Sequence, residues 1–199
     1  MGETPTTAAI ASGVPALAQA VVGLGPAWLD AAAVGPAFTV TTPGGDNLAI
    51  HLAVAQAAPG DVVVVEVSPR DDGVALVGDI VARAAALRGI AGIVVDGPIR
   101  DRAAIAALGF PVFHRGTSPI GPAKVGPVRV GARIAVQGVS IEPGDLVCCD
   151  ADGIVVVGAA RAGEAIAAAA DVIRREAEVE RRIEAGETTV EIFDLEVHE

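Results

Sequence analysis

The sequence predicts an α/β fold with a largely parallel core, an antiparallel C-terminal β segment and a C-terminal helical arm. Residues 36–115 alternate short apolar runs with helix-forming segments, which is the pattern of a parallel sheet whose strands are joined by helices. From Val125 onward, short apolar segments are separated by turn residues alone, which indicates antiparallel strands. Residues 160–185 are helix-forming, and their second half is highly charged. We interpret residues 1–199 as a single domain with its core at about residues 30–160.

The first elements follow from the placement of glycine, proline and capping residues. Residues 7–22 contain a glycine and a proline among helix formers, so two short helices are expected. Residues 37–42 alternate and are rich in β-branched side chains, which predicts a strand. Asp46 or Asn47 is then placed to cap a helix over residues 48–58.

The middle of the chain carries the apolar runs of a buried sheet. Residues 61–67 form a continuous apolar run of strand length, typical of a strand covered on both faces. A helix is expected next, opened by Gly78-Asp79 and closed by Gly89. It is followed by a buried strand at 90–96 that ends in a turn at Asp96-Gly97-Pro98. A helix at 100–109 and a strand at 110–116 complete this part of the chain. In the antiparallel segment, turns are expected at Gly131, Pro143-Gly144 and Asp152-Gly153.

Composition and charge exclude several classes of protein. The formal net charge of −11 counts against a surface that follows nucleic-acid phosphates, which requires clustered Lys and Arg. No apolar run is long enough to cross a membrane, and the N-terminus has no basic region typical of a signal peptide, so a cytoplasmic location without a membrane partner is expected. Cys148 and Cys149 are adjacent and would point to opposite faces of a strand, so we expect buried thiols and no disulfide.

Arg100 and Asp101 follow a buried strand and precede a helix, where the ligands of α/β proteins gather. An aspartate there can ligate a hard divalent cation, and an arginine can bind a carboxylate through two hydrogen bonds. The alternative is a surface ion pair that caps the helix. Twenty residues lie between Asp79 and Arg100. One helix and one strand fill this gap, so Asp79 and Asp101 can share one edge of the sheet, beside the free N–H groups of Ile80 and Val81. Taken alone, Asp79 is a helix cap.

The lysine content bears on whether the chain can use a covalent lysine intermediate. Schiff-base chemistry needs a nucleophilic lysine, and Lys124, in a Pro- and Gly-rich loop, is the only lysine in the chain. A site that works through a metal is therefore favoured over a Schiff base.

Other candidate residues have simpler interpretations. His51 falls on an apolar helix and is interpreted as a satisfied, partly buried histidine, with a ligand role as the alternative. His114-Arg115 is interpreted as structural, with pocket lining as the alternative, and His198 as solvated. Residues 23–28 lack the third glycine of a dinucleotide-binding loop. The Glu-rich helix is either a solvated face or an arm that reaches a neighbouring subunit.

The pattern Asp79-x20-Arg100-Asp101 resembles the signature of the class II 4-hydroxy-4-methyl-2-oxoglutarate aldolases, whose family also contains the regulator of ribonuclease E activity A. Four further segments carry the resemblance: FTVTTPGGDNLAIHLAVAQAAPGDVVVVE, GIAGIVVDGPIRD, FPVFHRGTSPIGPAKVGPV and IEPGDLVCCDADGIVVV. The resemblance covers roughly residues 30–160 and, more loosely, the C-terminal helix. Members often have an acidic residue three positions after the metal-site aspartate, where this chain has Ala104.

The resemblance implies a homotrimer or a hexamer with active sites at subunit interfaces. In such a site Asp101 ligates Mg²⁺ or Mn²⁺ and Asp79 holds a water molecule on the metal. Arg100 binds the pyruvyl portion of the substrate. The turn Gly78-Asp79 and the amides of Ile80 and Val81 receive the substrate carboxylate. A glutamate from the neighbouring subunit's C-terminal helix completes the site; Glu176 is the first choice and Glu178 the alternative.

The implied reaction is metal-dependent retro-aldol cleavage of a 2-oxo acid to pyruvate through an enolate, with oxaloacetate decarboxylation as a side activity. The alternative is a non-catalytic protein that uses the same fold to bind a ribonuclease or another partner. The presence of both Asp79 and Asp101 favours the enzyme, because a pure binding protein has no need for them. A third reading is another lyase or hydrolase of 2-oxo acids at the same site.

Overall fold

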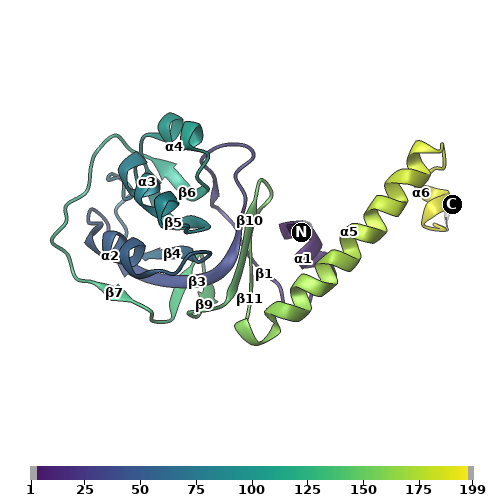
Figure 1. Ribbon diagram of the computed structural model, residues 1–199, viewed down its shortest axis with the longest axis horizontal. Helices are drawn as coiled ribbons and strands as arrows, with labels where there is room; N and C mark the ends of the chain where they lie inside the picture. Colours follow the sequence, from purple (N-terminus) through teal and green to yellow (C-terminus); the bar gives the residue numbers. More distant parts are fainter. Residues whose placement is uncertain (1–3, 197–199) are drawn as a thin grey trace.

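A curved mixed β-sheet carries helices on two sides in the computed structural model, which describes residues 4–196 (Figure 1). The strands are β1 Gln19–Val21, β2 Gly25–Pro26, β3 Ala33–Thr42, β4 Val62–Val67, β5 Gly92–Ile99, β6 Val112–Thr117, β7 Arg129–Val130, β8 Ile134–Val136, β9 Val139–Ile141, β10 Leu146–Asp150 and β11 Gly153–Val157. The helices are α1 Thr7–Gly13, α2 Leu48–Gln56, α3 Asp79–Leu87, α4 Arg102–Leu108, a 3₁₀ turn at Ala159–Arg161, α5 Ala162–Glu184 and α6 Thr189–Ile192.

The predicted parallel core is confirmed. Strands β3, β4, β5 and β6 are neighbours in that order and pair in parallel. Helices α2, α3 and α4 connect them and lie together on one face of the sheet (Figure 1). The apolar side chains of this face pack with the helices in one core, in which Ile50, Val63 and Ile93 are fully buried. Because the strands run in parallel, their carboxyl ends lie at one edge of the sheet, together with the loops that follow them.

The predicted antiparallel segment is also confirmed, and β3 joins it to the parallel core. The first part of β3 pairs antiparallel with β10, while residues 37–42 pair in parallel with β4. Strand β10 also pairs antiparallel with β11. Cys148 and Cys149 on β10 are buried and belong to different apolar clusters, as expected for side chains on opposite faces. Burial and nearby Asp150 raise the pKa of the Cys148 thiol to about 12, so this thiol stays protonated at neutral pH.

Two local predictions were wrong. The second short helix expected within residues 7–22 is instead β1, because tertiary pairing of Gln19–Val21 with β11 outweighs the helix preference of this Ala-rich segment. The turn expected at Asp96-Gly97-Pro98 is instead part of β5, which continues to Ile99. An irregularity in its pairing with β6 between Val95 and Pro98 accommodates the glycine and proline.

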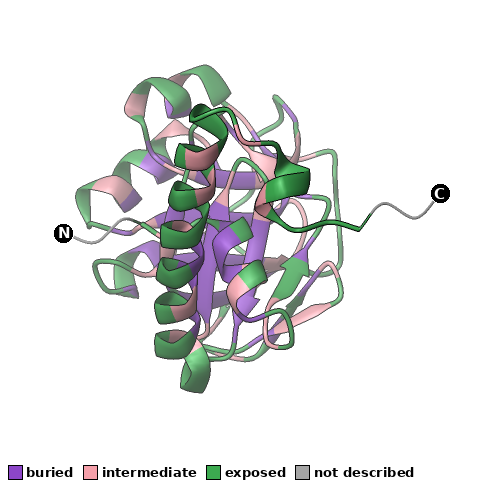
Figure 2. Cartoon of the chain, turned by 90° about the vertical axis from the view of Figure 1, so that its right-hand side faces the viewer, coloured by how far each residue is buried: buried purple, intermediate pink, exposed green. Residues whose placement is uncertain are grey.

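Helix α5 covers the antiparallel half with its first part and then projects away from the sheet. Ala165, Ala169 and Val172 are its buried residues, and they pack with α1 and the strands β10 and β11. Residues 173–184 continue the helix for about 18 Å without a buried side chain (Figures 1 and 2). We call this projecting part, together with α6, the arm. No helix among residues 4–196 is both long and apolar enough to cross a membrane.

Candidate active site at the start of α3

The segment before α3 and the end of β5 meet at the carboxyl edge of the sheet. Val77 forms a parallel bridge with Ile99, and the Arg100 amide donates to the Val77 carbonyl at 2.9 Å. This pairing brings Asp79, the first residue of α3, beside Arg100 and Asp101. The proximity expected from their spacing in the sequence is therefore present.

Asp101 holds its carboxylate toward α3 and not toward the helix that it precedes. It is the N-cap of α4 with φ 57°, in the left-handed region, and its side chain makes no capping hydrogen bond. Its Oδ2 lies 3.4 Å from the Asp79 amide nitrogen and 3.4 Å from Arg100 Nε. The side chain remains 38% exposed. The carboxylate is thus oriented by neighbours and still open to a ligand, which a simple capping aspartate would not be.

Two glycines allow the Arg100 and Asp101 side chains to approach the backbone. A Cβ atom on Gly78 would lie 2.7 Å from Asp101 Oδ2 and 3.2 Å from Arg100 Nε. A Cβ atom on Gly121 would lie 2.6 Å from Arg100 Nη1. The 2.7 Å and 2.6 Å distances are shorter than side-chain packing permits, so a larger residue at either position would require the Asp101 carboxylate or the Arg100 guanidinium to move. Gly78 belongs to the predicted turn before the helix, whereas no sequence pattern indicates the role of Gly121.

A small cavity of about 60 Å³ lies between the start of α3 and the start of α2, and Arg100 forms part of its wall. Asn47 and His51, four residues apart on α2, also line it. Asn47 Nδ2 donates to the Leu76 carbonyl at 2.8 Å, while Asn47 Oδ1 and His51 Nε2 are buried without a hydrogen-bond partner among residues 4–196. His51 is partly buried as expected, but the expectation that its side chain is satisfied was wrong. From the sequence, Asn47 is predicted only as a possible helix cap.

Lys124 is held over the same cavity by its neighbours in the chain. Asp46 Oδ2 accepts hydrogen bonds from the amides of Val125 at 2.7 Å and Gly126 at 2.9 Å, and Asp46 Oδ1 accepts one from Leu48. Burial acts to raise the pKa of Asp46, but these three amides outweigh it and hold the pKa below its usual value. Lys124 lines the cavity as a second cation besides Arg100, and the neighbouring Asp46 carboxylate is already committed to backbone amides.

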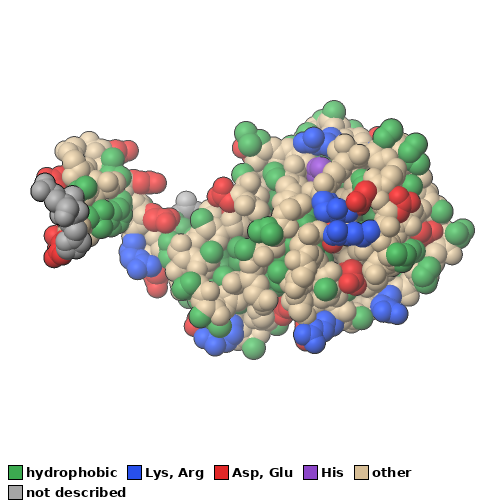
Figure 3. Space-filling model, turned by 180° about the vertical axis from the view of Figure 1, so that it is seen from behind, with side chains coloured by type: hydrophobic (Ala, Val, Ile, Leu, Met, Phe, Trp, Pro, Cys, Tyr) green, Lys and Arg blue, Asp and Glu red, His purple; other side chains and the backbone are tan. Residues whose placement is uncertain are grey.

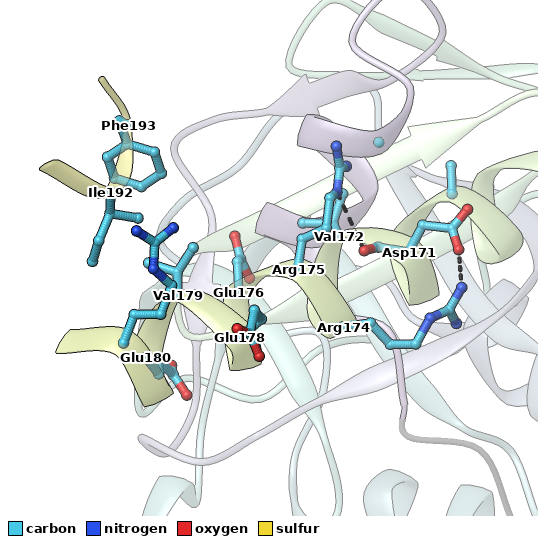
Figure 4. Close-up of a pocket in the computed structure, with 13 residues that line it drawn as sticks. Asp171, Val172, Arg174, Arg175, Glu176, Glu178, Val179, Glu180, Ile192 and Phe193 are labelled. Carbon is cyan, nitrogen blue, oxygen red and sulfur yellow. Dashed lines mark hydrogen bonds and ion pairs between the residues drawn. The ribbon is translucent and has the colours of Figure 1, made fainter. Parts of the chain in front are cut away.

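The glutamates proposed from the C-terminal helix do not lie at this site within one chain. Glu176 and Glu178 are on the arm, on the opposite side of the molecule from α3 and α4 (Figure 1). They line an open groove of about 1220 Å³ between α5 and α6 (Figure 4). Asp79, Arg100 and Asp101 take no part in this groove. Its apolar lining includes Val179 and Phe193.

A buried ionic cluster at the same sheet edge was not anticipated from the sequence. Asp96 is 4% exposed, and both of its carboxylate oxygens lie 2.8 Å from Arg70 Nη2. Gln137 Nε2 donates to it at 2.6 Å, and Arg115 Nε lies 3.1 Å away. Arg115 also pairs with Asp72, so its expected structural role agrees with its contacts. The cluster ties the segment after β4 to β5 and β6.

The remaining histidines stand apart from the cavity described above. His114 lies within β6, and burial lowers its pKa, so it is neutral at neutral pH. Its Nδ1 is buried and has no hydrogen-bond partner in the described part of the chain. His198, expected to be solvated, lies outside the described residues.

Comparisons with known proteins point to one family. The RraA-like family model, described as Aldolase/RraA, matches residues 10–156. A Halalkalibacterium halodurans protein with the provisional name 4-hydroxy-4-methyl-2-oxoglutarate aldolase is 48% identical over 124 residues, which are 62% of this chain and 59% of that protein. A Methanocaldococcus jannaschii protein without an assigned activity is 32% identical over 121 residues, which are 60% of this chain and 57% of that protein. The chain thus spans less than two thirds of the length of these curated relatives.

Solved structures share the fold over most of the chain. Streptomyces coelicolor RraAS2, described as an unusual member of the RNase ES inhibitor RraA protein family, aligns with a TM-score of 0.74 and 30% identity. That alignment covers 88% of this chain and 91% of RraAS2. An uncharacterized protein from Pseudomonas syringae pv. tomato aligns with a TM-score of 0.81 and 29% identity, covering 92% of this chain and 86% of that protein.

Proposed function

The chain belongs to the RraA-like family, Aldolase/RraA, and on this premise we propose that it is a divalent-metal-dependent aldolase. It cleaves 2-oxo acids of the 4-hydroxy-4-methyl-2-oxoglutarate type by a retro-aldol reaction that releases pyruvate, and it decarboxylates oxaloacetate as a side activity. The observation that carries this proposal is the open Asp101 carboxylate beside Arg100 at the N-terminus of α3. The provisional aldolase name of the H. halodurans relative supports the same reaction.

The side chains at this edge fit Mg²⁺ or Mn²⁺, with Asp101 as the ligand. Among the described residues, no group of three or more His, Cys, Asp and Glu side chains is arranged to hold a metal ion. A site with one protein carboxylate suits Mg²⁺, which commonly keeps several waters and accepts oxygens from the substrate. When bound, the cation supplies positive charge where the electron pair of the broken C–C bond accumulates.

The chain's own groups bind the substrate and move its protons. Arg100 pairs with the pyruvyl portion, and the N–H groups of Ile80 and Val81 at the start of α3 receive the carboxylate. Gly78 leaves room for the Asp101 and Arg100 side chains beside these amides. Asp79 orients the water molecule that takes the proton from the 4-hydroxyl group. As the 4-hydroxyl oxygen becomes a carbonyl, the C–C electron pair passes to the keto group, giving the enolate of pyruvate, and Arg100 stabilises this charge more strongly than the neutral ketone. The enolate then takes up a proton from water at its methylene carbon, and pyruvate leaves together with the second carbonyl product. Loss of CO₂ from oxaloacetate gives the same enolate.

Pyruvate release from both 4-hydroxy-4-methyl-2-oxoglutarate and oxaloacetate is expected to require Mg²⁺ or Mn²⁺. EDTA should remove the activity and excess metal should restore it, because the chain offers no lysine at the site for a Schiff base except Lys124. Lactate dehydrogenase and NADH report the pyruvate continuously. Metal without protein is the control, since cations decarboxylate oxaloacetate by themselves. Release that is undiminished in EDTA, or no release from either substrate, would contradict the proposal.

A glutamate on the arm is proposed to complete the site of a neighbouring subunit in a homotrimer or hexamer. The arm has no buried side chain after Val172, so it has contact surface left for another chain. Glu176 makes no ion pair with any described residue, whereas Glu178 pairs with Arg181. Glu176 is therefore the better placed of the two to enter a second site, and Glu178 stays the alternative.

Mixing two inactive variants tests this shared site. Glu176→Ala and Asp101→Ala subunits, refolded together in equal amounts, are expected to regain about one quarter of wild-type activity, because that share of the interfaces pairs an intact Asp101 with an intact Glu176. Each variant refolded alone is the control. If no ratio of the two restores pyruvate release although size-exclusion chromatography shows mixed oligomers, the arm does not complete the site.

The alternative function is a non-catalytic regulator that binds a ribonuclease or another protein. The alignment with RraAS2, which is described as a member of an RNase inhibitor family, favours this alternative. Basic side chains on the face drawn in Figure 3 lie in small groups beside acidic ones and form no continuous basic strip. A regulator of this kind would act through protein contacts, so its effect on the partner protein's activity would be retained in an Asp101→Ala variant.

A further inference from the structure

The loop between β4 and α3 determines where α3 begins, and with it the backbone amides to which we assign the substrate carboxylate. Residues 68–73 of this loop are all exposed, and exposed loops are usually the more mobile parts of a fold. Near the end of the loop, the Leu76 amide donates to the Pro98 carbonyl of β5 at 2.9 Å. The position of α3 relative to Arg100 and Asp101 therefore depends on how firmly the loop is held against β5.

One buried carboxylate holds this loop to the sheet. Asp96 lies on β5, the strand that leads to Asp101, and is 4% exposed. Both of its oxygens lie 2.8 Å from Nη2 of Arg70, which belongs to the exposed part of the loop. Arg115 of β6 lies against the same carboxylate, with Nε 3.1 Å from Oδ1, and it also pairs with Asp72 of the loop. Loop and sheet thus each contribute one arginine and one aspartate to the contact.

Buried charges of this kind add little net stability to a fold. Removing them from water costs free energy that their attraction barely returns, and apolar side chains packed in the same space often give equal or greater stability. Ion pairs and hydrogen bonds to charged groups do fix distance and direction. The two positive and two negative charges balance, and Gln137 Nε2 adds a hydrogen bond to Asp96 at 2.6 Å. The cluster therefore contributes more to the geometry of the loop than to the stability of the fold.

We propose that Asp96 and Arg70 are positioning residues, which hold the start of α3 where its amides and Arg100 can bind one substrate carboxylate together. This inference rests on the proposed aldolase function. Neither side chain lines the cavity beside Arg100, so both act through the backbone. The ion pair holds the loop, and the bond from Leu76 to Pro98 joins the end of the loop to the end of β5. Without the ion pair, the start of α3 can move away from Arg100.

The test compares Arg70→Ala with Arg70→Lys. The Arg70 side chain is 45% exposed, so its replacement leaves the core intact. In Arg70→Ala we expect KM for both substrates and the Kd of pyruvate in Mg²⁺ to rise about 10-fold or more, since a hydrogen bond between charged groups is lost. The effect on kcat should be smaller. Arg70→Lys, whose ammonium group can still pair with Asp96, should recover most of the affinity.

Hydrogen exchange followed by mass spectrometry gives a readout that does not depend on activity. Arg70→Ala should speed the exchange of amides in residues 74–81 and leave the rest of the sheet unchanged. Asp96→Asn should have the same effects, and the double variant should add little, because either change breaks the same ion pair. Arg133→Ala removes an exposed arginine that pairs with Glu142, and as the control it should alter neither KM nor exchange.

The outcomes separate a positioning role from a structural one. A loss of stability alone lowers the amount of active protein and leaves its affinity for substrate unchanged. Unchanged KM and pyruvate affinity in Arg70→Ala would therefore overturn the inference, even if the melting temperature fell, and so would unchanged exchange in residues 74–81. In both cases the wild-type protein is still an aldolase. A wild-type protein that is inactive on both substrates would overturn the proposed function, and pyruvate binding and exchange would then decide whether Arg70 holds the start of α3.

Discussion

Replacement of Asp101 by alanine is expected to abolish metal-dependent pyruvate release, lowering kcat/KM by about 10³-fold or more, because a catalytic cation contributes several kcal/mol to the stabilisation of developing charge. Asp101 is the carboxylate that we assign to the metal, and no group of three or more metal-binding side chains among the described residues can replace it. The coupled pyruvate assay measures the loss, and Mn²⁺ binding followed by electron paramagnetic resonance shows whether affinity for the cation falls in parallel.

The backbone at Asp101 decides which control is informative. Its φ of 57° lies in the left-handed region, which asparagine tolerates better than alanine. Asp101→Asn therefore keeps the fold and the side-chain shape while removing the charge, and it should be as inactive as Asp101→Ala. Asp152→Ala, at an exposed aspartate in the turn between β10 and β11, should keep full activity. Full activity of Asp101→Ala protein in EDTA would disprove the metal mechanism.

The parallel core could be predicted because its signals are local. Residues 62–65 are four consecutive valines, all fully buried, since a strand covered on both faces has almost no solvent-facing positions. The helix at Asp79–Leu87 was predicted for a similar reason, as its glycine and aspartate at the start and its glycine after the end are helix boundary signals. These patterns depend on neighbouring residues in the sequence, so they can be recognised without knowledge of the tertiary contacts.

The errors occur where distant contacts determine the conformation. Asp96-Gly97-Pro98 has the composition of a turn, yet Pro98 pairs with Gly116 on β6 and the strand continues. Arg70 and Gln137, which hold the Asp96 carboxylate, come from segments far from it in the sequence. Nothing in the local sequence indicates these partners. The same holds for residues 19–21, whose strand conformation depends on β11.

The candidate site was predicted only in part. Asp79, Arg100 and Asp101 could be placed together because one helix and one strand separate them, and the geometry brings them into contact. Asn47 and His51 also reach the cavity, but their relevance lies in atoms that lack a partner, and a missing partner cannot be detected in a sequence. Their spacing of four residues, which places both on one face of a helix, was the one signal that could have linked them.

Arg100→Lys is the second change with a large expected effect: kcat/KM for both substrates should fall by about 10²-fold or more, because lysine cannot reproduce the two parallel hydrogen bonds of a guanidinium. Gly121 leaves space for Arg100 Nη1 at a point where a Cβ atom would be 2.6 Å away, so the site is shaped for this planar group. Steady-state kinetics with both substrates measure the effect, and pyruvate binding by calorimetry should weaken as well.

A pure charge effect predicts a different result for the same substitution. If Arg100 contributed only its positive charge, lysine would retain most of the activity and Arg100→Ala alone would be inactive. If instead its two-pronged geometry matters, lysine and alanine should be similarly impaired. Arg88→Lys, at the exposed C-cap of α3, changes the same group outside the site and should leave kinetics unaltered. Near-wild-type kinetics for Arg100→Lys would mean that the amides of Ile80 and Val81 bind the pyruvyl portion. Arg100 would then contribute only its positive charge beside Asp101.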